Sequence, residues 1–95
     1  MTGPEAAKPY ELSITSPARR SLSERLPEAV AAAAYEFMVG PLLAEPYRVG
    51  KQLFSPRDGV FSARRGTYRI LYEIDDDLRT VRVVDVGHRR DIYRR

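Results

Sequence analysis

The stretch Gly-Val-Phe-Ser-Ala-Arg-Arg-Gly-Thr-Tyr-Arg-Ile-Leu-Tyr-Glu-Ile, residues 59–74, decides the fold. Two runs rich in β-branched and aromatic residues, 60–65 and 68–74, are separated only by Gly66 and Thr67. A two-residue connection with glycine first is typical of a β-hairpin, and it fixes the register of the two strands. The predicted partners across the hairpin are Arg65 and Tyr68, Arg64 and Arg69, Ala63 and Ile70, Ser62 and Leu71, and Phe61 and Tyr72.

The two faces of this hairpin differ in character, because side chains alternate between the faces of a strand. One face is mostly apolar and is predicted to pack on the core. The other, named here the arginine face, includes Arg64 and Arg69 in directly opposed positions. Like charges opposed in this way destabilise a sheet by a few tenths to about 1 kcal/mol. Two interpretations stay open: both side chains extend into water, or they hold an anion such as phosphate, which suits forked guanidinium donors.

A third strand is predicted from Thr80 to Val86, after a turn around residues 75–77. Pairing Ile74 with Arg79 places two valines of this strand on the core face. The same alternation predicts that four other side chains, in this strand and just after it, lie on the arginine face. The two sets are Val81 and Val83 on the core face, and Arg82, Val84, Val86 and His88 on the arginine face.

The first half of the chain supplies packing for the sheet. Alternating apolar residues predict a strand over residues 10–15, and Ser16-Pro17 then predicts a helix with Ser16 as its N-cap. Apolar residues at helical spacing predict a second helix from Glu28 to Val39, ended by Gly40-Pro41. The two helices should form a hairpin across the core face. We expect one domain over residues 9–95, preceded by a disordered leader over residues 1–8.

Composition narrows the function classes. Ninety-five residues form one small domain, and the absence of cysteine excludes disulfides and thiolate metal sites and fits a cytoplasmic location. The sequence has no secretory start and no apolar run long enough to span a membrane. Residues 1–47 carry a net charge of −2 and residues 48–95 a net charge of +5, with arginine as 14 of the 16 basic residues. This asymmetry predicts either a nucleic-acid partner or an acidic protein partner.

Candidate catalytic residues cluster in the basic half. His88 is the only histidine, and imidazole is suited to general acid–base work near neutral pH. Nearby arginines would stabilise the charge of a phosphorane, and Tyr93 would stack on a base or orient a phosphate. No carboxylate cluster is predicted on the arginine face, so we expect neither a metal nor another cofactor. The candidate catalytic set is Arg64, Arg69, His88, Arg89 and Tyr93, and the candidate RNA-binding set is Lys51, Arg65, Arg82 and Arg90.

Three motifs together resemble the RelE group of the RelE/ParE toxin superfamily, in particular the short RelE-like toxins of actinobacteria. They are Gly-Lys-X-Leu at 50–53, Phe-Ser-Ala-Arg-Arg-Gly-Thr-Tyr-Arg-Ile-Leu-Tyr at 61–72 and Val-Gly-His-Arg-Arg-Asp-Ile-Tyr at 86–93. The resemblance covers residues 9–95. It implies an α+β fold, a mainly antiparallel, curved four-stranded sheet with an N-terminal helical hairpin packed on one face. The strand at 60–65 lacks the lysines of well-known members.

The resemblance also implies an activity. RelE toxins enter the ribosomal A site and cut mRNA there, by attack of a ribose 2′-hydroxyl on the adjacent phosphodiester without a metal. Arg69 resembles the family's phosphate-binding arginine, Arg89 the arginine after the last strand, and Tyr93 the tyrosine that contacts the cleaved nucleotide. His88 is then expected to move the proton. The implied partners are the ribosome, mRNA and a RelB-like antitoxin that forms a hetero-oligomer with the toxin and docks on the helical hairpin and the arginine face.

Two alternatives remain open from the sequence. A ParE-like protein would block DNA gyrase without cutting RNA, and the segment 88–91 fits that subgroup as well. A protein that only represses transcription together with its partner would cause no growth arrest. The proximity of Arg64, Arg69 and His88 favours the RelE interpretation.

Overall fold

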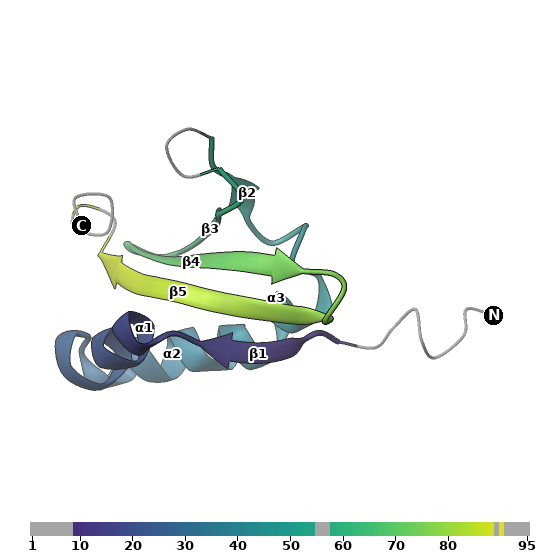
Figure 1. The fold of residues 1–95 in the computed structure, drawn as a ribbon. Coiled ribbons are helices and arrows are strands. Elements are labelled where there is room, and N and C mark those ends of the chain that lie inside the picture. The colour runs from purple at the N-terminus through teal and green to yellow at the C-terminus, as the bar shows by residue number, and fades with distance from the viewer. Residues whose placement is uncertain (1–8, 55–57, 89, 91–95) are drawn as a thin grey trace.

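The computed structural model describes residues 9–54, 58–88 and 90. Within these residues one sheet has the strand order β1-β5-β4-β3-β2, in which β1 lies parallel to β5 and the other neighbours are antiparallel (Figure 1). This confirms the predicted α+β class with a mainly antiparallel sheet, but the sheet has five strands where four were expected. The strands are β1 (Glu11–Ile14), β2 (Lys51–Gln52), β3 (Phe61–Arg65), β4 (Tyr68–Asp75) and β5 (Thr80–His88).

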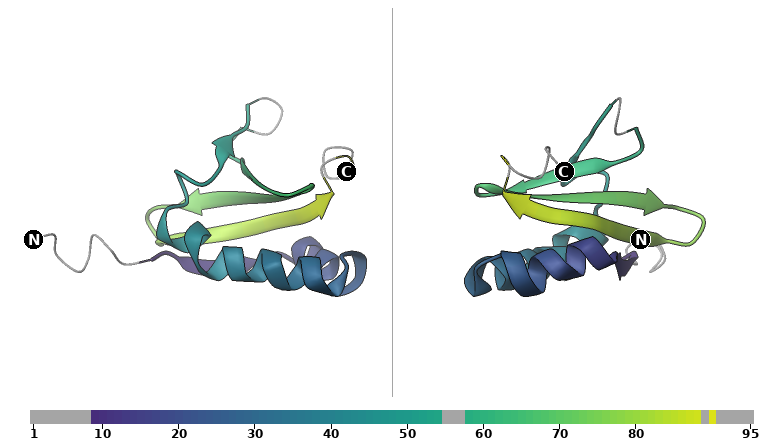
Figure 2. Two further views of the ribbon diagram at one scale, coloured as in Figure 1. Left: turned by 180° about the vertical axis from the view of Figure 1, so that it is seen from behind. Right: turned by 60° about the vertical axis from the view of Figure 1, so that its left-hand side comes forward.

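The helices lie together on one face of the sheet (Figure 2). They are α1 (Ser16–Arg20), the π-helical turn η2 (Ser21–Arg25), α2 (Glu28–Val39) and α3 (Pro41–Ala44). The bounds of α2 match the prediction. The N-cap of α1 is Thr15, not Ser16, because the Thr15 hydroxyl accepts the backbone N–H of Ala18. The predicted leader over residues 1–8 lies outside the described residues.

The core forms between α2 and the apolar face of the sheet. Tyr72, Ile70 and Val83 of the sheet are fully buried, as is Met38 on α2. Alternation on β4 places Tyr72 and Ile70 on the same side of the sheet, and both belong to the core cluster. The predicted core face is therefore confirmed. The arginine face is therefore turned away from α2.

The hairpin of β3 and β4 has the predicted register in all five pairs, from Phe61 with Tyr72 to Arg65 with Tyr68. Gly66 has a φ of 64°, a conformation that glycine adopts without steric cost. At the next turn the prediction was wrong, because Ile74 pairs with Val81 and not with Arg79. The observed partner of Ile74 differs from the predicted one by two residues. A shift of two leaves each side chain on the face that was predicted for it.

A β-bulge in β5 overturns part of the predicted arginine face. Leu71 pairs with Asp85 and the next residue, Tyr72, pairs with Val83, so Val84 is the extra residue. After the bulge the alternation is reversed relative to the prediction. Val86 is buried opposite Ile70 in the core, and the predicted position of His88 on the arginine face was also wrong because His88 pairs with Tyr68.

None of the helices within residues 9–54, 58–88 and 90 combines the length and apolar character needed to cross a membrane.

Candidate functional site

A cavity of about 540 Å³ opens between the segment 48–53 and the arginine face of β3 and β4. In chain order, its walls are formed by the loop after α3, by β2 and by β3. Eight of the residues that the structure describes line it, and among these eight four are cationic and none is acidic. We name it the basic pocket, and its lining is Arg48, Val49, Gly50, Lys51, Leu53, Ser62, Arg64 and Arg69.

The cationic side chains of the basic pocket come from two sides. Arg64 and Arg69 are directly paired across β3 and β4, with Arg64 exposed and Arg69 half-buried. Lys51 pairs with Ser62, which adds a cation on the neighbouring strand β2. Arg48 forms an exposed ion pair with Glu45 at 3.1 Å. An arrangement of cations around one cavity suits a group with several anionic oxygens, such as a phosphodiester.

Two of the predicted RNA-binding arginines lie elsewhere. The Arg65 guanidinium lies over the ring of Phe37, 4.7 Å from its centroid, on the helical side of the sheet. Arg82 pairs with Glu73 across β4 and β5, with 2.7 Å between Nη2 and Oε1. Neither side chain lines the basic pocket.

His88 is also separate from the basic pocket. Its ring meets Tyr68 edge to face, with 5.6 Å between centroids, and its Nδ1 accepts the backbone N–H of Arg90 at 3.1 Å. Tyr68 belongs to the face that packs toward α2, so His88 is directed away from Arg64 and Arg69. The predicted site residues Arg89 and Tyr93 lie outside the described residues.

The candidate sets from the sequence lacked two polar residues of the basic pocket, Arg48 and Ser62. Arg48 lies in a loop, where no periodicity indicates which way a side chain points. Its signal is its position three residues before Lys51 on a short connection that must return to the sheet. Ser62 is buried on the arginine face, two residues before Arg64 on β3.

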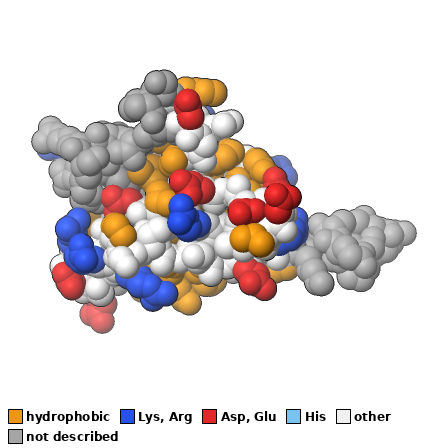
Figure 3. Space-filling view, in the orientation of Figure 1, with side chains coloured by type: hydrophobic (Ala, Val, Ile, Leu, Met, Phe, Trp, Pro, Cys, Tyr) orange, Lys and Arg blue, Asp and Glu red, His pale blue; other side chains and the backbone are white. Residues whose placement is uncertain are grey.

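Acidic side chains gather at the other end of the sheet, where the β4–β5 turn lies (Figure 3). Asp76 in this turn accepts hydrogen bonds from two tyrosines, Tyr10 at 2.6 Å and Tyr47. The two bonds lower the pKa of Asp76 from its ordinary value. The bond between Tyr47 and Asp76, together with desolvation, raises the pKa of Tyr47 to about 12. Asp76 therefore holds two aromatic side chains, one from each of two segments far apart in the sequence.

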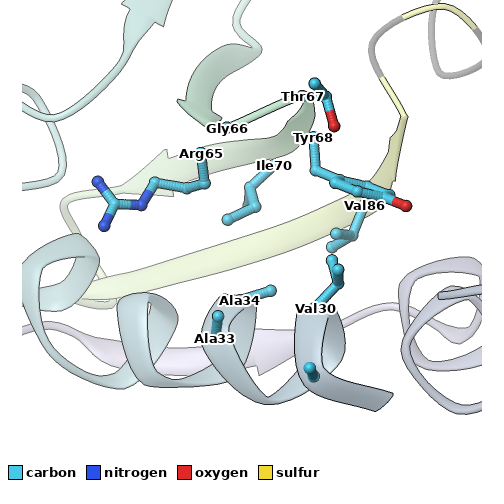
Figure 4. Close-up of a pocket in the computed structure, with 10 residues that line it drawn as sticks. Val30, Ala33, Ala34, Arg65, Gly66, Thr67, Tyr68, Ile70 and Val86 are labelled. Atoms are coloured by element: carbon cyan, nitrogen blue, oxygen red, sulfur yellow. The ribbon is translucent and has the colours of Figure 1, made fainter. Parts of the chain in front are cut away.

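A second cavity, of about 480 Å³, lies between α2 and the tip of the β3–β4 hairpin. Figure 4 shows Ala33 and Ala34 of α2 opposite Ile70 and Val86 of the sheet, with Tyr68 near one end of the cavity. Its walls are mostly apolar, which distinguishes it from the basic pocket. We name it the apolar groove.

Among residues 9–54, 58–88 and 90, no three histidine or acidic side chains are grouped as metal ligands would be. The arginines and the lysine of the basic pocket can stabilise negative charge that develops on a bound group.

The family model described as "ParE toxin of type II toxin-antitoxin system, parDE" matches residues 12–93, which include all of the strands and helices above except the first residue of β1. This chain belongs to the RelE/ParE superfamily of type II toxins. The resemblance found in the sequence motifs is thereby confirmed at the level of the family. The basic pocket and the apolar groove are thus features of a RelE/ParE toxin.

Three relatives show how close the likeness is. This RelE/ParE toxin is 54% identical over 87 residues to Toxin RelG of Mycobacterium tuberculosis, covering 92% of this chain and 99% of that protein. It is 48% identical over 86 residues to Toxin RelE of the same organism, covering 90% and 88%. The crystal structure of the M. tuberculosis toxin–antitoxin complex RelBE2 contains a chain that superposes with a TM-score of 0.81 at 52% identity, covering 85% of this chain and 92% of that one.

Proposed function

We propose that this toxin is a ribosome-dependent endoribonuclease that cuts mRNA in the A site and so inhibits translation. The observation that carries the proposal is the basic pocket, where Arg64 and Arg69 are held in opposed positions beside Lys51. Opposed like charges destabilise a sheet, and a phosphodiester bound between the two arginines reduces that penalty because its negative charge attracts both guanidinium groups.

The proposed reaction needs no metal. The ribose 2′-oxygen attacks the adjacent phosphorus and loses its proton, the bond to the 5′-oxygen breaks, and that oxygen gains a proton. The products are a 2′,3′-cyclic phosphate and a 5′-hydroxyl. Arg64, Arg69 and Lys51 stabilise the negative charge that develops on the phosphorane, which is an electrostatic contribution of the oxyanion-hole kind.

The proton carrier in this proposal is a group other than His88. The His88 ring packs against Tyr68 on the helical side, and its Nδ1 is engaged by the backbone N–H of Arg90. In this proposal Arg89 helps to neutralise the charge that develops on the phosphate, and Tyr93 contacts the cleaved nucleotide as the family resemblance implies. Arg48, which also lines the basic pocket, binds the RNA backbone.

The test is nucleotide-resolution mapping of mRNA in a cell-free translation reaction, with and without ribosomes, after addition of the toxin. Cuts within A-site codons that require ribosomes are the expected result. The matched variant is Arg69→Ala, with Arg82→Ala as the control for loss of an arginine outside the basic pocket. Cutting of free mRNA at the same rate contradicts ribosome dependence.

A second candidate function is inhibition of DNA gyrase without RNA cleavage. The match of residues 12–93 to the ParE toxin pattern favours it, as does the position of His88 away from the basic pocket. Inhibition of supercoiling by the purified toxin, with mRNA left intact in the translation reaction, decides for this candidate.

The partner in the proposal is a RelB-like antitoxin that forms a hetero-oligomer with the toxin in the cytoplasm. The relative with the TM-score of 0.81 comes from the toxin–antitoxin complex RelBE2, which supports this partner. The apolar groove offers a mostly apolar surface beside α2, with Arg65 at its rim to pair with an acidic residue. An amphipathic antitoxin helix fits such a surface, and copurification of the two proteins tests it.

A further inference from the structure

One wall of the basic pocket is a loop that is anchored from inside the protein. The hydroxyl of Tyr72, a fully buried side chain, donates to the backbone carbonyl of Pro46 at 2.6 Å. Gly50 packs directly on the same hydroxyl, since a Cβ at this position would lie 2.3 Å from Tyr72 Oη. The first and last residues of the segment 46–50 are therefore held by one core side chain.

The same loop is anchored a second time from outside, by Tyr47. Its hydroxyl donates to Asp76 Oδ2 in the β4–β5 turn, and its ring contacts Phe61 edge to face with 5.6 Å between centroids. The Tyr47 ring is 54% exposed, so burial contributes little to holding it there. The hydrogen bond to a carboxylate is instead the strong restraint, because charged acceptors roughly double the strength of such a bond.

Tyr47 lies between an anchored residue and a pocket residue in the chain. Pro46 precedes it and Arg48 follows it, and Lys51 starts β2 three residues beyond Arg48. A restraint on Tyr47 thus limits the positions that the backbone of Arg48 can take. Holding a binding group in place before its ligand arrives lowers the entropic cost of binding.

We propose that Tyr47 and Asp76 form a clamp that positions Arg48 and Lys51 for a phosphate group in the basic pocket, with Tyr47 as a positioning residue. The inference rests on the proposed function only in identifying that phosphate as part of RNA. The clamp explains why an exposed turn carboxylate receives the hydroxyl of a tyrosine from the pocket loop. It also gives a role to the acidic end of the sheet, where Asp76 anchors the pocket loop without lining the pocket.

The second tyrosine on Asp76 provides a matched control. Tyr10 donates to Oδ1 of the same carboxylate at 2.6 Å, but it precedes β1 and is distant in sequence from the pocket loop. Tyr10→Phe and Tyr47→Phe each remove one hydroxyl and keep the ring. A purely structural role for the Asp76 cluster predicts the same effect from both.

The experiment titrates inorganic phosphate into the full-length chain and follows backbone amide shifts of Gly50, Lys51 and Ser62 by NMR. Tyr47→Phe is expected to weaken phosphate binding by about 3- to 10-fold, the scale of the net contribution of one typical hydrogen bond. Tyr10→Phe is expected to stay within about twofold of wild type, the scale of a change outside the site. Equal affinities in wild type and Tyr47→Phe, or equal losses in both variants, overturn the clamp.

Asp76→Ala removes the acceptor of the same hydrogen bond and is expected to weaken phosphate binding as much as Tyr47→Phe does, so it keeps the test informative if Tyr47→Phe lowers solubility. A clamp formed by two residues predicts that the double variant binds phosphate no more weakly than either single variant, whereas additive losses contradict it. Ribosome-dependent cleavage is measured on the same proteins. If wild type binds phosphate in the pocket and cuts no RNA, the proposed function fails and the clamp stands; if wild type binds none there, the clamp fails.

Discussion

Arg64 and Arg69 lie directly opposite each other on adjacent antiparallel strands, and both line the same cavity. A sheet gains nothing from this pair, because like charges in opposed positions repel. The pair is therefore explained by the anion that it can bind and not by a contribution to the stability of the fold. Replacing either arginine should separate activity from stability.

Arg64→Ala should lower the single-turnover rate of mRNA cleavage on programmed ribosomes by at least about 10-fold, the lower range for loss of one charge-stabilising donor. The free energy of unfolding should stay unchanged or rise by up to about 1 kcal/mol, because the repulsion is removed. Urea denaturation measures the second effect. Arg82→Ala is the control, with full activity and a stability loss below about 1 kcal/mol for an exposed ion pair. A less stable Arg64→Ala protein contradicts the argument.

His88→Ala should retain a cleavage rate within about threefold of wild type, as expected for a residue that contacts no reacting atom. The physical reason is the β-bulge at Val84, which directs His88 toward Tyr68 and not toward the basic pocket. The rate is measured over a range of pH on programmed ribosomes. Loss of a neutral-pH step from the profile of His88→Ala restores the acid–base role that the sequence alone suggested.

Stability should fall at alkaline pH through the tyrosines. The hydrogen bond to Asp76 raises the pKa of Tyr47 to about 12, and burial raises that of Tyr72 to about 12. Folding thus favours the neutral phenols, so their contribution is complete below the ordinary pKa of about 10 and is lost as pH rises through about 12. Urea midpoints of Tyr47→Phe should fall less over this window than those of wild type. Tyr35→Phe is the control, and identical pH curves for wild type and Tyr47→Phe oppose the prediction.

Gly50→Ala should destabilise the fold by about 1–3 kcal/mol, the usual range for overpacking. The added Cβ would lie 2.3 Å from Tyr72 Oη and 3.0 Å from the backbone oxygen of Ser62. Equilibrium urea unfolding measures the loss. The double variant Gly50→Ala with Tyr72→Phe should be less destabilised than the sum of the single variants, because the phenylalanine lacks the clashing oxygen. Additive losses show that the hydroxyl is not the obstacle.

Ala33→Glu should weaken antitoxin binding at least 10-fold, since a buried unpaired carboxylate in an apolar interface is costly. Ala33 lines the apolar groove, whereas Ala32 is exposed on the same helix outside it. Ala32→Glu is therefore the matched control and should bind normally. Calorimetric titration of the two variants with a RelB-like antitoxin makes the comparison. Equal binding by both moves the partner to another surface.

The sequence was sufficient wherever a local feature dictates the geometry. Gly66-Thr67 allows only a tight hairpin, so the register of β3 and β4 was predicted in full. Apolar spacing and Gly40-Pro41 defined α2 in the same way. The core face of the sheet followed from these two elements without any knowledge of the strand order.

The errors have a common physical origin in features that local pattern does not encode. Residues 83–86 read Val-Val-Asp-Val, so apolar side chains occur at both parities and no pattern shows which residue is extra. The bulge that reassigned Val86 and His88 was therefore invisible. The basic pocket was half predicted for the same reason: Arg64 and Arg69 follow from register, but Arg48 depends on the path of a loop.

The extra residue in β5 also bears on how relatives are aligned. Because Val84 has no paired residue on β4, deleting it would leave the observed pairs from Asp85 with Leu71 to His88 with Tyr68 intact. A one-residue gap in an alignment at Val84 therefore does not change the side of the sheet on which the following side chains lie. A gap elsewhere in β5 moves those side chains to the opposite side. Homologous residues near the chain end should accordingly be matched by the side of the sheet they occupy, and not by counting from the preceding turn.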